Sequence, residues 1–161
     1  MFGFKKKVDV VEIHAPVSGE LIALSKTKDA VFSTGAMGQG FAIEPNANEI
    51  ISPFDGKISV VAETKHAIGM TTSDGLEVLL HLGIDTVELG GSPFVVPVKV
   101  GDKVKVGQRL VLMDRQKIQG NGLLATVMVV ITNSNDKLES LDVEEKKYAV
   151  GEIVGTLKLK N

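Results

Sequence analysis

Residues 66–81 read His-Ala-Ile-Gly-Met-Thr-Thr-Ser-Asp-Gly-Leu-Glu-Val-Leu-Leu-His, two apolar segments joined at Asp74-Gly75, with a histidine at each outer end. Two short apolar runs on either side of an Asp-Gly pair are typical of a β-hairpin. The chain has three histidines and no cysteine. This one hairpin therefore carries two of the three imidazoles of the chain, the side chains best suited to act as nucleophile near neutral pH when cysteine is absent.

The composition is that of one globular domain without a strong charge bias. The 161 residues include 43% hydrophobic residues and carry a formal net charge of -2, which gives no general attraction to nucleic acid or to a membrane surface. The absence of cysteine fits a reducing cytoplasm. No apolar stretch approaches the roughly 20 residues that cross a bilayer. We therefore expect a cytoplasmic protein with no membrane span and no nucleic-acid partner.

Short strands and turns follow one another along almost the whole chain. Turn residues recur roughly every 8–12 residues, and the segments between them are rich in branched apolar residues, as in an all-β sandwich or barrel. Residues 114–120 favour a short helix, and residues 143–147 a loop or a single helical turn. The expected strands cover residues 8–14, 19–24, 40–43, 49–52, 57–62, 75–82, 94–98, 109–113, 125–131 and 153–159.

A pattern of small residue, proline, apolar residue, polar residue and glycine occurs at 15–19 and again at 52–56. Barrels built from duplicated, swapped hairpins use such turns, although chance similarity between turns gives the same pattern. We predict an antiparallel β-sandwich or barrel of the duplicated hybrid-motif type, with at most short helical turns. Residues 1–12 are expected to form a flexible N-terminal segment, and residues 13–161 a single domain.

The register of the hairpin decides whether its histidines meet. If Asp74-Gly75 is a two-residue turn, the numbers of paired residues sum to 149, and His81 lies opposite Ile68. His66 and His81 are then diagonal neighbours on one face, close enough for the rings to touch, and Thr64 shares that face. A three-residue turn changes the sum to 148 and places the two imidazoles on opposite faces.

Two adjacent imidazoles can serve phosphoryl transfer. One neutral ring can carry a phosphoryl group on a nitrogen while the other donates a hydrogen bond to that group. The hydroxyl of Thr64 and the backbone carbonyl near Gly83 could each hold one ring in a fixed tautomer. Two histidines with no shared function remain the plain alternative.

Zinc chemistry is a second alternative, because two imidazoles and Asp85 could leave an open position on the metal. The chain has no His-x-His or His-Glu-x-x-His arrangement, and His14 lies far upstream in the sequence. A biotinyl or lipoyl carrier module is a third alternative, since its barrel has similar turns. That class needs a lysine at an exposed hairpin tip in a Met-Lys-Met or Asp-Lys-Ala context, which this sequence lacks.

Several motifs resemble those of the glucose-family enzyme IIA of the bacterial phosphoenolpyruvate-dependent sugar phosphotransferase system. The resemblance covers roughly residues 13–157, and its motifs occur in the order of that family. They are Val31-Phe32, Met37-Gly-Gln-Gly-Phe-Ala-Ile-Glu-Pro, Ser52-Pro-Phe-Asp-Gly-Lys-Ile, Thr64-Lys-His-Ala, His81-Leu-Gly-Ile-Asp-Thr-Val-Glu-Leu and Val104-Lys-Val-Gly-Gln.

The resemblance implies a phosphocarrier with a phosphohistidine intermediate. His81 corresponds to the phosphoryl acceptor and His66 to the histidine that stabilises the phosphoryl group. Thr64 corresponds to the threonine that orients the second ring, and Gly83 to the glycine whose carbonyl fixes the tautomer of the first. The family's partner-binding surface corresponds to Asp29, Phe32, Met37, Ile68, Leu79 and Asp85.

The same resemblance implies the partners. The phosphoryl donor would be HPr, and the acceptor a cysteine of an enzyme IIB domain. We expect a phosphotransferase component that works as a monomer, without a cofactor and without a metal. Sugar specificity would lie elsewhere, because this component does not touch the sugar.

Overall fold

The computed structural model describes residues 9–161, which form β-strands linked by turns and a few short helices. The helical segments are the 3₁₀ turns η1 (Leu24–Lys26), η2 (Phe32–Thr34) and η3 (Thr86–Leu89), and the α-helical turns α1 (Arg115–Gly120) and α2 (Ser134–Lys137). The strands are β1 (Val10–His14), β2 (Gly19–Ala23), β3 (Gln39–Pro45), β4 (Glu49–Ile51), β5 (Gly56–Val61), β6 (Ala67–Thr72), β7 (Glu77–Ile84), β8 (Phe94–Val95), β9 (Lys103–Val104), β10 (Arg109–Met113), β11 (Leu124–Ile131), β12 (Leu138–Val143), β13 (Lys147–Tyr148) and β14 (Ile153–Leu159).

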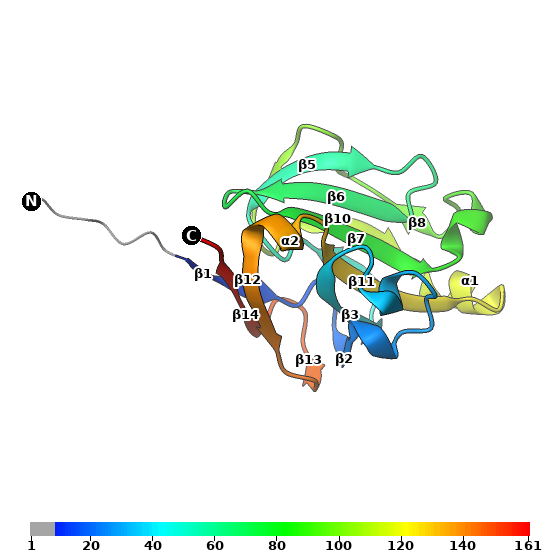
Figure 1. Ribbon diagram of the computed structural model, residues 1–161. Helices are drawn as coiled ribbons and strands as arrows, with labels where there is room; N and C mark the ends of the chain where they lie inside the picture. Colours follow the sequence, from blue (N-terminus) through cyan, green and yellow to red (C-terminus); the bar gives the residue numbers. More distant parts are fainter. Residues whose placement is uncertain (1–8) are drawn as a thin grey trace, which may run out of the picture.

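Three antiparallel sheets make up the described part of the chain. The largest has eight strands in the order β13-β2-β3-β11-β7-β6-β5-β9, and two three-stranded sheets have the orders β1-β14-β12 and β4-β10-β8. In Figure 1, β5, β6 and β7 run side by side, while β1, β12 and β14 lie together near the C-terminus. The predicted all-β fold with short helical turns is confirmed.

The pairing register of β6 and β7 differs from the one predicted for a two-residue turn at Asp74-Gly75. Ile68 pairs with Leu80 and Ala67 with His81, so the numbers sum to 148. The loop has three residues, since the amide of Thr72 donates to the carbonyl of Leu76. Its third residue, Gly75, has φ +83°, the left-handed conformation that closes a three-residue hairpin loop. The predicted register of 149 is wrong.

This register sorts the side chains of β7 onto two packed faces, one fully buried and one half-buried. Leu80 and Leu82 point into the central core together with Ile68 of β6. Leu79 points to the other face, where a second cluster, the outer-face cluster, consists of Leu24, Phe32, Ala42, Ile84, Met128 and Val130. The segment from η1 to η2 covers this face of the sheet. A strand buried on both faces loses the plain alternation of apolar and polar residues.

The helix expected at residues 114–120 is present as α1. Its N-cap is Asp114, whose side chain accepts a hydrogen bond of 3.0 Å from the amide of Lys117, and an aspartate at this position stabilises the first turn of a helix. Strand β12 was not expected, because Leu138-Glu-Ser-Leu-Asp-Val has several residues that are uncommon in strands.

The N-terminal strand bears on the proposed domain boundaries. Val10 of β1 pairs with Lys158 of β14, so an ordered strand begins inside the segment 1–12 that was expected to be flexible. Residues 1–8 of that segment lie outside the described residues. The division of the chain into 1–12 and 13–161 stays a prediction.

The central core predicts a large effect for Ile68→Ala. Ile68 is 0% exposed, and we expect its truncation to lower the free energy of unfolding by about 2–5 kcal/mol, because the cavity is lined by packed neighbours. Urea denaturation measures this change. The matched control is Val60→Ala on the adjacent strand β5, where the side chain is 51% exposed and the expected change is within about 0.5 kcal/mol. Equal losses in the two variants would contradict the assignment of Ile68 to the core.

Candidate functional site

His81 projects from β7 onto the outer face of the large sheet. Its neighbours across the two adjacent strands are Ala67 of β6 and Met128 of β11. The Nδ1 atom of His81 lies 2.9 Å from the carbonyl oxygen of Gly83. Because a carbonyl can only accept, Nδ1 carries the hydrogen and donates it. The neutral ring therefore has its free electron pair on Nε2.

Gly83 can present its carbonyl in this way because it adopts φ +84°. This left-handed conformation interrupts β7 and turns the carbonyl back toward the side chain two residues earlier. Glycine reaches such a φ without steric cost, unlike residues that carry a Cβ atom. The hydrogen bond of His81 thus depends on a glycine at position 83.

His66 lies immediately before the first residue of β6. Its carbonyl still accepts a hydrogen bond of 2.7 Å from the amide of Leu82, but Lys65 before it has φ +60°. Strict alternation would place the side chain of His66 on the face of Ile68, in the central core. Because Lys65 turns the chain at the start of the strand, the side chain of His66 leaves the alternation of β6. It lies beside His81 on the outer face instead.

The two imidazoles meet despite the register of 148. Their ring centroids lie 5.2 Å apart with an interplanar angle of 78°, an edge-to-face arrangement. Thr64 Oγ1 and His66 Nδ1 are 2.6 Å apart, a short hydrogen bond. The expectation that this register separates the rings is wrong, because it assumed that His66 lies within the regular strand. Each ring has its Nδ1 atom occupied, and within the described part of the chain the two Nε2 atoms have no hydrogen-bond partner and are left for a ligand.

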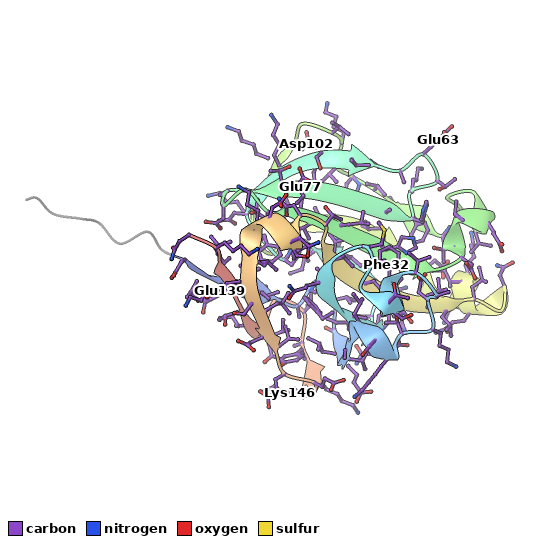
Figure 2. The ribbon with its side chains drawn as sticks, viewed as in Figure 1. Phe32, Glu63, Glu77, Asp102, Glu139 and Lys146 are labelled. Atoms are coloured by element: carbon purple, nitrogen blue, oxygen red, sulfur yellow. The ribbon has the colours of Figure 1, made fainter. Side chains whose placement is uncertain are left out.

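Phe32 packs against His81 from the segment that covers the outer face. Its ring centroid lies 4.9 Å from that of His81, with a tilt of 49°. Figure 2 shows Phe32 on the segment between β2 and β3, which lies over the strands of the large sheet. Asp29 holds this segment, because Oδ1 accepts hydrogen bonds of 2.9 Å and 2.8 Å from the amides of Val31 and Phe32. Asp29 therefore places Phe32 against the imidazole.

The environment keeps both imidazoles neutral near neutral pH. Burial lowers the pKa of His81, and the nearby His66 lowers it further, while the hydrogen bond to Gly83 and the carboxylates of Asp29 and Asp85 act in the opposite direction. Burial also lowers the pKa of His66. A neutral imidazole retains the electron pair that a nucleophile needs.

The remaining residues of the expected partner surface differ in how exposed they are. Met37 is 38% exposed in the loop between η2 and β3, and Leu79 is half-buried at the outer-face cluster. Asp85 is exposed, with φ +61° at the start of η3. Ile68 is a correction: it is fully buried in the central core. The register of 148 pairs it with Leu80 on the inner face, so it does not belong to a surface.

One residue of the site was missed by the sequence analysis. Thr86 is fully buried, and its hydroxyl donates to the carbonyl of Leu82, with a distance of 2.5 Å. A threonine four residues after the end of a strand-like run can bond back to the carbonyl at position i−4. The Asp85-Thr86 pair directly after Gly83-Ile84 was the available signal.

Within residues 9–161 no group of three or more His, Cys, Asp or Glu side chains could hold a metal ion. None of the helices in this part of the chain has the length and apolar character that a membrane crossing requires.

Comparisons with known proteins agree on one family. The model of the family "phosphoenolpyruvate-dependent sugar phosphotransferase system, EIIA 1" matches residues 11–137. The PTS system glucose-specific EIIA component of Staphylococcus epidermidis is 40% identical over 151 residues, which are 93% of this chain and 90% of that protein. The PTS system beta-glucoside-specific EIIBCA component of Bacillus subtilis (strain 168) is 47% identical over 123 residues. These residues are 76% of this chain but span 20% of that relative.

A solved structure has the same fold. Glucose permease IIA from Mycoplasma capricolum matches with a TM-score of 0.83 and 32% sequence identity, and the match covers 97% of this chain and 99% of that chain. The matches in sequence and structure do not favour the zinc-hydrolase or the biotinyl and lipoyl carrier alternatives.

The lowered pKa values of His66 and His81 predict a loss of stability in acid. Because burial holds both values below the ordinary value of about 6.5, the unfolded chain binds more protons than the folded chain as the pH falls through that range. The contribution of these two histidines to the free energy of unfolding is therefore fully present above about pH 6.5 and is lost toward lower pH. We expect a shallower decline in the double variant His66→Gln/His81→Gln. Urea midpoints at about pH 7.5 and about pH 5.5 measure this difference, and identical declines would contradict it.

Proposed function

This chain belongs to the EIIA 1 family of the phosphoenolpyruvate-dependent sugar phosphotransferase system, and we propose that it carries the phosphoryl group on Nε2 of His81. It is a phosphocarrier of that system. The observation that supports His81 is the ring pair, in which both Nδ1 atoms are occupied and neither Nε2 atom has a hydrogen-bond partner among residues 9–161. The proposed site of action is the cytoplasm, which fits a chain without cysteine.

Phosphoryl transfer to His81 requires a free electron pair on Nε2. That pair forms the new N–P bond while the N–P bond of a phosphohistidine on the donor breaks, and the electrons of the broken bond stay on the donor ring. Positive charge develops on the imidazole of His81 as the bond forms. The carbonyl of Gly83, which accepts the Nδ1 hydrogen at 2.9 Å, stabilises this charge, because the dipole is already oriented.

His66 is suited to bind the transferred group. With its pKa lowered by burial, the ring is neutral, and it can donate from Nε2 only if Nδ1 accepts a hydrogen bond. The hydroxyl of Thr64, 2.6 Å away, supplies that bond by donating to Nδ1. The Nε2 hydrogen of His66 then points to a phosphoryl oxygen on the neighbouring ring, where charge increases during transfer.

The proposed docking surface surrounds the ring pair. It consists of Asp29, Phe32, Met37, Leu79 and Asp85, an apolar centre with two carboxylates. Such a surface excludes water when a partner binds, and this protects the phosphoryl group from hydrolysis. The proposed donor is HPr. The acceptor is an EIIB domain, a choice supported by relatives in which EIIA and EIIB belong to one protein, and the proposed receiving group there is a cysteine.

Substitution of the two histidines separates acceptance from onward transfer. After incubation with phosphoenolpyruvate, enzyme I and HPr, we expect mass spectrometry to detect one acid-labile phosphoryl group on the wild type and none on His81→Ala. His66→Ala is expected to accept the group but to pass it to an EIIB domain about 10²–10³-fold more slowly, since it lacks one donor to the developing charge.

His14→Ala is the matched control, because His14 lies at the end of β1, in a different sheet from the ring pair. It is expected to accept and transfer like the wild type. Phosphorylation of His81→Ala would reject the acceptor assignment, and a His66→Ala variant that accepts no phosphoryl group would reject the division of roles.

The docking surface predicts an effect for Met37→Lys. A charge in the apolar part of the surface should weaken partner binding, so we expect the KM for HPr to rise about tenfold with little change at saturation. The control is Val95→Lys, a 63% exposed valine in the separate sheet β4-β10-β8. Steady-state phosphorylation at several HPr concentrations measures both. An equal response of the two variants would remove Met37 from the docking surface.

A further inference from the structure

We propose that Thr86 is a positioning residue: it fixes the peptide group at Gly83 and thereby selects the tautomer of His81. This inference rests on the proposed function, because it explains how Nε2 of His81 is kept free for phosphoryl transfer. The hydroxyl of Thr86 carries this role, and its methyl limits the space beside Gly83.

The hydroxyl of Thr86 holds the peptide that precedes Gly83. It donates to the carbonyl of Leu82 at a distance of 2.5 Å, in a fully buried position. The carbonyl of Leu82 belongs to the same rigid peptide plane as the amide of Gly83. A rotation of that plane would change φ of Gly83. The hydrogen bond therefore restrains the dihedral angle that sets the direction of the next carbonyl.

The methyl of Thr86 closes the space beside Gly83. A Cβ atom built on Gly83 would lie 2.4 Å from Cγ2 of Thr86 and 2.9 Å from the carbonyl oxygen of Leu124. The Cα atom of Gly83 is thus confined between a side chain of η3 and the backbone of β11. Both the peptide plane and the Cα atom are held, and the left-handed φ of +84° is kept.

The chain around Thr86 explains why such a restraint is needed. Asp85, between Gly83 and Thr86 in the sequence, has φ +61°. A residue with a side chain adopts this conformation only where the surrounding structure fixes it. The bond from Thr86 back to Leu82 closes the turn that contains both left-handed residues. Without it, the carbonyl of Gly83 can turn away from Nδ1 of His81, and the ring can then place its hydrogen on Nε2.

Two substitutions separate the hydroxyl from the methyl. Thr86→Val keeps the shape but lacks the donor, and Thr86→Ser keeps the donor but lacks the methyl. In the unphosphorylated, ¹⁵N-labelled protein, long-range ¹H–¹⁵N NMR distinguishes a protonated Nδ1 from a protonated Nε2. We expect His81 of the wild type and of Thr86→Ser to be protonated on Nδ1, and His81 of Thr86→Val to show a mixture of both tautomers.

The matched control is Thr72→Val. Thr72 is also buried, and its hydroxyl bonds to a backbone group, the amide of Leu76 at 3.1 Å, but at the turn end of the same hairpin. We expect Thr72→Val to lower stability and to leave the tautomer of His81 as in the wild type. A structural effect common to buried threonines would instead change both variants alike and would overturn the proposal.

Two further readouts follow from the loss of the Gly83 bond. The hydrogen bond to Gly83 raises the pKa of His81. Thr86→Val loses this bond but keeps the other charged neighbours of His81, which are His66, Asp29 and Asp85. We therefore expect a lower pKa of His81 in Thr86→Val than in the wild type. Transfer from phospho-HPr in a single turnover should slow by about 10–100-fold in Thr86→Val, and Thr86→Ser should retain most of the rate.

The outcomes distinguish this inference from the proposed function. A Thr86→Val protein with the wild-type tautomer overturns the inference, whatever its transfer rate. If Thr86→Val does not fold, a mixed tautomer in Thr86→Ser overturns it instead, since the donor is still present. A wild type that accepts no phosphoryl group rejects the proposed function, whereas the NMR comparison of unphosphorylated proteins still tests Thr86.

Discussion

The hydrogen bond from Nδ1 of His81 to the carbonyl of Gly83 is the interaction on which the site depends. It decides which ring nitrogen carries the hydrogen, and so which one can act as a nucleophile. The bond exists only because β7 is interrupted at a left-handed glycine. The chemistry of a side chain is thus set by a backbone conformation two residues away, and the strand that carries His81 is regular up to the point where this conformation begins.

The platform beneath the site is stiff because β7 has packed neighbours on both faces, although its outer face is only half-buried. The central core packs against Leu80 and Leu82, and the outer-face cluster packs against Leu79. A side chain on such a strand has little freedom, since close packing on either side resists displacement. Asp29 adds to this by fixing Phe32 against the imidazole. The proposed role of His81 gains from this arrangement, because an acceptor nitrogen must be ready for one partner after another without reorganisation.

Much of the fold could be predicted from the sequence, whereas the geometry of the hairpin could not. Alternating apolar segments and regularly spaced turns are local features, and they predicted the β architecture, just as the stretch 114–120 predicted α1. The Asp74-Gly75 pair is compatible with loops of two or three residues, and one residue of difference reverses every face assignment. The placement of Ile68 on the partner surface came from the family resemblance, and the observed register shows instead that this side chain faces the central core. The meeting of His66 and His81 depends on Lys65 in a left-handed conformation, which no pattern of residue types specifies.

The pairing of β1 with β14 has a consequence for how such a domain can be attached to others. Val10 lies opposite Lys158, so the polypeptide enters and leaves the domain at neighbouring points, on a sheet distinct from the one that carries His81 (Figure 1). A linker attached to β1 or to β14 would therefore leave the domain at the same sheet. Such a domain can therefore be part of a larger protein, as in the EIIBCA relative, without a change in the sheet that carries His81.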